Sequence, residues 1–355
     1  MSNTSATSHL WPGVPLALGS AVLFGASAPL SKLLLGSVNP WLLAGILYLG
    51  AGLGLGGFHL GRRIVGLPSV EAPLARKDLP WLAAVIFFGG VLGPLLLMFG
   101  LSLTSASTGS LLLNLEGLAT MAIAWLVFRE NVDRRLLLGA LAILAGAVLL
   151  TWNGQAVQID LGAALIAGAC LAWGIDNNLS RKLSSADPVQ IAMIKGVVAG
   201  AVNFSLALAA GATPPPPTFI LAGAVVGSLG IGASLVMFML GLRHLGTART
   251  GAYFSLAPFI GAVLALVLVR EPLTPTLIVA GLLMGFGLWM HLTERHVHDH
   301  AHATLEHEHR HVHDEHHQHE HEGPVTEPHS HWHRHEPMRH SHPHYPDLHH
   351  RHRHG

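Results

Sequence analysis

The chain has 355 residues, of which 50% are hydrophobic and only 11% are charged, whereas about a quarter of the residues of a typical soluble domain carry a charge. This composition excludes an ordinary soluble globular domain and indicates a membrane protein. Twenty Lys and Arg residues balance twenty Asp and Glu residues. The formal net charge of zero therefore indicates no nucleic acid or other polyanionic partner.

The apolar residues fall in ten runs, each long enough to cross a hydrocarbon core about 30 Å thick as a helix. We predict transmembrane helices at about residues 14–35, 40–60, 79–101, 104–128, 135–152, 161–180, 188–210, 218–242, 247–269 and 275–293. The first run has neither a basic leader nor a small-residue cleavage site, so we expect it to be retained. The single cysteine, Cys170, lies inside the sixth run and is expected to be a buried structural thiol.

The distribution of Lys and Arg predicts the orientation. If the N-terminus is cytoplasmic, the loops on that side hold eleven of these residues: Arg62, Arg63, Arg76, Lys77, Arg129, Arg134, Arg135, Arg181, Lys182, Arg243 and Arg249. The opposite side holds only Lys32 and Arg270. The positive-inside rule then places both termini in the cytoplasm and the protein in the inner (cell) membrane.

Two alignments of the chain with itself indicate an internal duplication. At an offset of 149 residues, LFGASAPLSK (23–32) aligns with AWGIDNNLSR (172–181). At an offset of 141, residues 89–130 align with residues 230–271, and both segments end in Arg-Glu. Each repeat holds five spans, and because five is odd the second repeat enters the bilayer from the opposite side. Inverted repeats of this kind build many secondary transporters, which bind substrate near the midplane.

We therefore predict an all-α membrane protein with ten transmembrane helices in two inverted five-helix repeats, followed by a disordered His-rich tail. The predicted parts are a short cytoplasmic N-terminus (1–13), a first repeat (14–152), a second repeat (161–293) and a cytoplasmic tail (296–355).

Four motifs carry a family resemblance: FGASAPLSKLLL in the first span, AWLVFREN at the end of the fourth, and their partners AWGIDNNLSRKL and GAYFSLAPFIGAVLALVLVREPLT. With these motifs, residues 14–293 resemble the EamA-type members of the drug/metabolite transporter superfamily. The resemblance implies alternating-access transport of a small metabolite, often outward, and does not specify which one. That family usually has a proline in the middle of the fourth span, as Pro258 stands in the ninth, but here Glu116-Gly117 takes its place.

Glu116 is the leading candidate for the transport path. Counted at 1.5 Å per residue from Glu130, it lies about 21 Å above the cytoplasmic end of its span, close to the midplane. A carboxylate at this depth is costly in hydrocarbon, so it is expected to face protein or water. It could couple proton movement to transport or bind a cationic group, or it could be a neutral carboxyl that fixes helix packing. Asn114 lies on another face of the helix, whereas Thr120 shares the face of Glu116.

A second polar group is WGIDNN (173–178) in the sixth span. Asp176 and Lys195 lie at depths that differ by about 5 Å, as judged from the helical rise. We therefore predict an ion pair between them, either structural or functional. Asn177 could add polar lining. Trp173 and Tyr253 could stack on an organic substrate or a cation, although such residues are more often packing or interface anchors.

The composition changes abruptly at His296, because 23 of the 27 histidines lie in the last sixty residues. This tail contains little that could form a core, so we expect disorder. Its H-x-H spacing places neighbours on one side of an extended chain. Imidazole binds Zn, Ni, Co and Cu, and we expect several weak, interchangeable sites. The candidate ligands are His298, His300, His302, His307, His309, His311, His313, His316, His317, His319 and His321.

The tail has three interpretations: a metal buffer or sensor, a pH-responsive segment, or a solvated low-complexity tail with incidental metal affinity. For the whole chain we predict a transporter, specifically an exporter, of a small metabolite or drug-like solute. The alternatives are divalent metal efflux and a membrane-anchored metal-binding protein that moves nothing. No cofactor motif or nucleophile-base pair is apparent, so we expect no enzyme activity and no required cofactor. The sequence specifies neither the substrate nor the oligomeric state.

Overall fold

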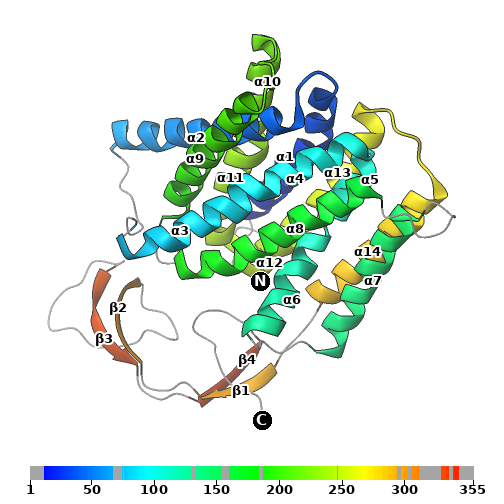
Figure 1. Cartoon of the computed structure of the whole chain (residues 1–355). Coiled ribbons are helices and arrows are strands. Elements are labelled where there is room, and N and C mark those ends of the chain that lie inside the picture. Colours follow the sequence, from blue (N-terminus) through cyan, green and yellow to red (C-terminus); the bar gives the residue numbers. More distant parts are fainter. Residues whose placement is uncertain are drawn as a thin grey trace, which may run out of the picture. The chain divides into compact units, whose positions relative to one another are not determined.

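The computed structural model describes residues 12–66, 74, 76–128, 133–152, 160–183, 187–245 and 247–293, together with four segments of the tail (297–301, 305–311, 329–335 and 339–343). The chain divides into two compact units, Met1–Leu292 and Thr293–Gly355. The first unit is helical throughout its described residues, as Figure 1 shows.

The first repeat contains α1 (Gly13–Leu35), α2 (Pro40–Ile64), the short helix η1 (Arg76–Asp78), α3 (Leu79–Val85), the π-helix η2 (Ile86–Leu92), α4 (Gly93–Leu103), α5 (Ala106–Leu112), α6 (Leu115–Phe128) and α7 (Arg134–Thr151). The second contains α8 (Leu161–Ser180), the short helix η3 (Arg181–Leu183), α9 (Pro188–Ala209), α10 (Pro217–Gly227), the π-helix η4 (Ser228–Ala233), α11 (Ser234–Leu245), α12 (Thr247–Phe254), α13 (Ala257–Leu268) and α14 (Pro275–Leu292).

Nine helical stretches among the described residues are long and apolar enough to cross a membrane. They are Gly13–Leu35, Pro40–Ile64, Arg76–Leu103, Ala106–Phe128, Arg134–Thr151, Pro188–Ala209, Pro217–Leu242, Arg249–Leu268 and Pro275–Leu292. The tenth predicted span is present as the 20-residue helix α8, but it is not among the nine. The reason is local, because α8 ends in Asp-Asn-Asn and these three residues lower its hydropathy.

The two repeats begin and bend their helices at matched places. Asn39 caps α2 by accepting from Trp41 N at 2.9 Å, and Asp187 caps α9 by accepting from Val189 N at 2.8 Å. A proline follows each cap at the first helical position, where its missing N–H costs nothing. The π-helices also correspond, since η2 shifted by 141 residues falls on η4. A duplicated sequence has thus kept its helix starts and its wide turns.

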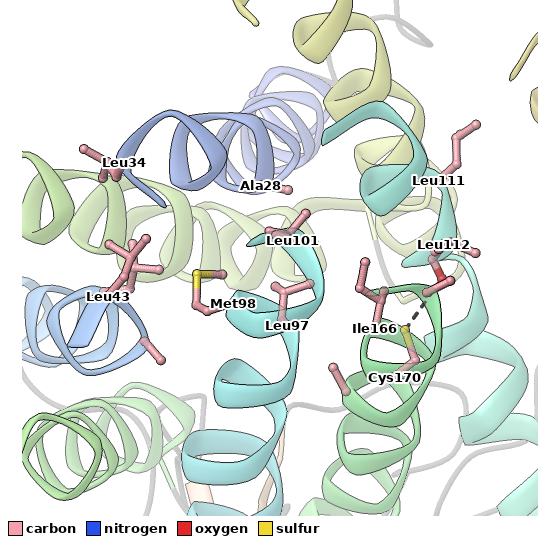
Figure 2. Packing of buried hydrophobic residues seen from close by; sticks show 14 of the residues in the cluster. Ala28, Leu34, Leu43, Leu97, Met98, Leu101, Leu111, Leu112, Ile166 and Cys170 are labelled. Carbon is pink, nitrogen blue, oxygen red and sulfur yellow. Dashed lines mark hydrogen bonds between the residues drawn. The ribbon is translucent and has the colours of Figure 1, made fainter. Parts of the chain in front are cut away.

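Small residues let the helices approach closely, as is common in membranes. Where α2 crosses α9, a Cβ added at Gly196 would lie only 2.7 Å from the Cα of Gly52. The buried side chains of the core come from both repeats and include Leu43, Leu101, Leu112 and Ile166 (Figure 2). Cys170 belongs to this core as predicted, and its thiol donates to the Leu112 carbonyl oxygen at 3.6 Å.

The tail contains four short strands, β1 (Val297–Ala301), β2 (Leu305–His311), β3 (His329–His335) and β4 (Arg339–Pro343). β1 pairs with β4 and β2 with β3, both antiparallel. This pairing differs from the disorder expected for residues 296–355. The physical reason is the H-x-H alternation, which has the period of two residues that suits an extended strand.

Candidate functional site

The fourth span is broken immediately before Glu116. Helix α5 ends at Leu112 and α6 begins at Leu115, which frees carbonyl groups that a continuous helix would use. Asn114 Nδ2 donates to the Leu111 carbonyl oxygen at 2.8 Å, and the thiol of Cys170 takes the Leu112 carbonyl. The carbonyl groups freed by the break therefore have hydrogen-bond donors, as backbone groups inside a membrane require.

The ninth span has a break at the matched position. Helix α12 ends at Phe254 and α13 begins at Ala257, and Ser255 Oγ donates to the Gly251 carbonyl oxygen at 2.7 Å. Pro258 follows this second break, whereas Gly117 occupies the corresponding position of the first. Both spans are thus interrupted, and the first one achieves this without a proline.

Glu116 binds a polar side chain of the facing helix α8. Asn177 Nδ2 donates to Glu116 Oε1 at 3.0 Å and to Thr120 Oγ1 at 3.2 Å. Thr120 Oγ1 in turn donates to the Glu116 carbonyl oxygen at 2.9 Å, which confirms that the two residues share a face. Glu116 is partly buried and Asn177 is exposed. A Cβ added at the neighbouring Gly117 would meet nothing within 4 Å, so the helix surface is open at the residue after Glu116.

The predicted ion pair is present next to this group. Lys195 Nζ on α9 donates to Asp176 Oδ2 on α8, and Ser180 Oγ donates to the other oxygen, Oδ1, at 3.3 Å. Asp176 is buried, while the side chain of Lys195 is 19% exposed. Asp176 directly precedes Asn177, the donor to Glu116, on α8. Two acidic groups and one basic group therefore share one polar cluster.

The π-helix η2 borders this cluster and is held by side chains of three other helices. Tyr48 Oη and Trp173 Nε1 both donate to the Gly89 carbonyl oxygen, at 2.9 and 3.0 Å. Asn203 Nδ2 donates to the carbonyl oxygens of Gly90 and Val91 at 3.4 and 3.2 Å. π-helical turns inside α-helices frequently occur at functional sites, and here the wide turn lies against the ion pair.

Gly89 permits that contact. A Cβ added to Gly89 would overlap the carboxylate of Asp176 and come close to Lys195 Nζ. Helix α8 is also held against α6 farther along, because Asn178 Nδ2 donates to the Thr120 carbonyl oxygen at 3.1 Å. The geometry of the cluster is therefore set by backbone contacts as well as by charges.

The structure separates two of the predicted residues from the others. Asn114 lies near α14, with Nδ2 3.9 Å from the sulfur of Met284, and Tyr253 lies on α12 in the second repeat. Glu116, Asp176, Asn177, Lys195 and Trp173 come together on or beside α6, α8 and α9. Sequence reasoning missed Tyr48 and Gly89. The coincidence of Gly89 with Gly230 in the duplicated sequence was the available signal for Gly89.

In the four tail segments that the structure describes, the histidines form no defined metal site. Among the residues that the structure describes, no group of three or more His, Cys, Asp and Glu side chains is placed to hold a metal ion. Of the eleven candidate ligands, His298, His300, His307, His309 and His311 lie in strands β1 and β2. The other candidates, His302, His313, His316, His317, His319 and His321, lie outside the described residues.

Comparisons with known proteins support this architecture. The model of the EamA-like transporter family matches the chain twice, over residues 11–152 and 160–293. An "uncharacterized transporter" of Methanothermobacter thermautotrophicus is 30% identical over 296 residues, which is 79% of this chain and 86% of the relative. One crystal structure superposes with a TM-score of 0.58 at 18% identity, covering 79% of this chain and 96% of that one. A similarity this low in identity shows the fold alone.

Proposed function

The chain belongs to the EamA-like transporter family and is a membrane transporter; from this premise we propose that it exports a small metabolite or drug-like solute by proton-coupled alternating access, with Glu116 as the coupling group. The observation that carries the proposal is the position of Glu116. Its carboxylate follows a helix break within a span and accepts a hydrogen bond from Asn177 of the facing helix α8. Ionisable groups inside membranes commonly mark substrate paths and proton relays.

The repeats of such a carrier would be inverted, with both termini in the cytoplasm. Three cation–aromatic contacts lie at the helix ends that this orientation places at the cytoplasmic interface: Arg135 over Trp289, Arg181 over Phe128 and Lys182 over Trp81, at 5.9, 5.7 and 5.9 Å. All three cations belong to the predicted cytoplasmic set. Aromatic rings and basic side chains are the usual residues at a membrane interface.

The test is transport by purified protein in proteoliposomes under an imposed pH gradient. Amino acids, nucleosides, cationic drugs and divalent metals would be offered to the full chain and to a chain without residues 296–355. An organic solute that still moves without the tail, together with a proton flux, supports the proposal. The second candidate, efflux of nickel, cobalt or zinc, is favoured only by the histidine tail. Metal movement that is lost with the tail would establish it.

A Glu116 series tests the coupling group in the same assay. Glu116→Gln keeps the size and the hydrogen-bond acceptor but removes the charge, so we expect a loss of proton-driven transport of about tenfold or more, or 1.4 kcal/mol per factor of ten. Glu116→Asp, which keeps a titratable group, serves as the matched control and should retain part of the activity. If Glu116→Gln transports normally while Glu116→Leu only lowers the protein yield, Glu116 has a structural role.

A further inference from the structure

Two charged residues at the predicted non-cytoplasmic end, Lys32 and Glu271, have specific partners. Lys32 near the end of α1 donates from Nζ to the carbonyl oxygens of Leu101 and Thr104, at 2.5 and 2.7 Å, and lies 3.4 Å from that of Ser102. The last carbonyls of a helix have no partner within the helix, and a cation suits that negative end. Lys32 therefore ties α1 to the end of α4.

Glu271 binds the other side of the same junction. Its Oε1 accepts from Ala106 N at 2.6 Å and its Oε2 accepts from Ser107 N at 2.8 Å, at the start of α5. The preceding residue, Arg270, has a φ of 58°, a left-handed conformation that turns the chain sharply after α13. Glu271 also attracts Lys32 electrostatically. The second repeat thus holds the first by a two-oxygen contact.

The α4–α5 junction gathers a third contact. Thr104 Oγ1 donates to Asp160 Oδ2 at 3.2 Å, and the other oxygen of Asp160 caps α8. Thr104 is consequently bound from α1 and from the start of α8, and Ala106 is bound from the α13–α14 connection. Contacts from spans of both repeats thus converge at this junction, where the two halves of the protein meet.

We propose that Lys32 and Glu271 form a latch that closes the non-cytoplasmic end of the transport path, and that the latch must open in each transport cycle. The inference rests on the proposed alternating-access function. It gives a role in the transport cycle to two residues that are not expected to contact the substrate. Breaking the Glu271 contacts would let the start of α5 move away from the second repeat. This movement would expose the face of α5 that is buried against α13.

Two buried hydroxyls provide reporters for this movement. Ser110 Oγ and Thr250 Oγ1 are buried and have no hydrogen-bond partner among the described residues. Ser110 lies on α5, one helical turn beyond the latch, and packs against Gly261 of α13. Thr250 lies on α12, which the duplication matches with α5, and packs against Gly241 of α11. Ser110 is thus behind the latch, and Thr250 lies in the other repeat, one residue before Gly251, the position that the 141-residue offset matches with Ser110.

The experiment measures cysteine labelling of the full-length protein in membrane vesicles by a membrane-impermeant maleimide. Ser110→Cys or Thr250→Cys is introduced after Cys170→Ala. The maleimide is added outside right-side-out vesicles for position 110, and outside inside-out vesicles for position 250, which lies beside Arg249 at the predicted cytoplasmic end. With the latch intact, both cysteines should react slowly. Adding Glu271→Ala should speed labelling at position 110 by about tenfold or more, equivalent to 1.4 kcal/mol, and leave position 250 unchanged. Lys32→Met should act in the same direction.

Two results would overturn the latch: rapid labelling at position 110 while Glu271 is intact, or an equal increase at both positions, which would indicate general loosening. If Glu271→Ala yields no protein, Glu271→Gln replaces it, since the amide retains an oxygen to accept from one of the two N–H groups, and a smaller increase confined to position 110 is expected. The labelling needs no transported solute. A response at position 110 with no transport of any tested solute would refute the proposed function, and transport without that response would refute the latch.

Discussion

The two repeats share their π-helices and helix breaks but not their charged residues. Each has a π-helix in its third span and a break in its fourth. At the positions where the first break carries Glu116 and Gly117, the second carries Ala257 and Pro258. The wide turns and the breaks are therefore properties of the duplicated fold, whereas the ionisable group near the midplane belongs to one copy only.

The ion pair shows the same asymmetry. Asp176 and Lys195 align with Ser27 and Leu47 of the other repeat, at offsets of 149 and 148 residues. The packing around them is nevertheless alike, because Gly89 contacts Asp176 and the matched Gly230 contacts Ser27. A common packing site thus holds a charge in one half and a hydroxyl in the other. The two repeats therefore differ at this site in charge and not in fold.

The largest effect on stability is expected from adding a methyl group at the two matched glycines, Gly89 and Gly230. Gly89→Ala would push its methyl group into the carboxylate of Asp176, which cannot move without breaking the buried ion pair. Removing such a pairing typically costs about 3–5 kcal/mol. Gly230→Ala would place its methyl group 2.8 Å from the Cβ of Ser27, a neighbour without charge.

Thermal unfolding in detergent, followed by size-exclusion chromatography, would compare the two variants. Gly89→Ala should lose more stability than Gly230→Ala. Equal losses would show that overpacking alone decides the outcome and that the ion pair contributes nothing to the difference.

The second prediction copies residues of one repeat into the other. Lys195→Leu introduces the residue type found at the matched position 47. It leaves Asp176 as a buried carboxylate without its cation, so we expect the free energy of unfolding to fall by about 3–5 kcal/mol. Adding Asp176→Ser, which copies position 27, removes the remaining charge. Most of the stability should return, because replacing both members of a buried pair is often neutral.

The measurement for this pair of variants is again thermal unfolding, with transport as the second readout. Restored stability with abolished transport would assign the ion pair to function. If the double variant is stable and transports normally, the pair has no part in moving the solute.

Much of the membrane part follows from sequence because its signals are local. The caps Asn39 and Asp187, each followed by proline, predict where helices begin, and the depth of Asp176 and Lys195 predicts that they can pair. Long-range contacts escape such reasoning. Tyr48 reaches the Gly89 carbonyl across 41 positions and Glu271 reaches Ala106 across 165, and no pattern within one span encodes either contact.

The π-helices were also beyond prediction from periodicity, since their composition is that of any apolar span. They are visible in the sequence only as matched glycines in the two repeats, Gly89 and Gly230. In the tail, the strands β1 to β4 follow from the period of two, which competes with the low hydrophobicity that favours disorder.

The smallest effect on stability is expected at Asn177, whose matched residue is Ala28. Asn177 is exposed, so Asn177→Ala should cost less than about 1 kcal/mol, the usual net contribution of a hydrogen bond. It would nevertheless remove the side chain of α8 that donates to the Glu116 carboxylate. Without that donor the carboxylate loses its hydrogen bond to α8 and is free to turn.

Transport under a pH gradient distinguishes this role from simple packing. We expect Asn177→Ala to keep the thermal stability of the parent protein and to reduce proton-driven transport several-fold, by less than Glu116→Gln does. Asn177→Gln, which can still donate from a longer side chain, should recover part of the loss. If Asn177→Ala instead transports at the parent rate over the whole pH range, then α8 does not act on Glu116, and the asymmetry between the repeats must work through the ion pair alone.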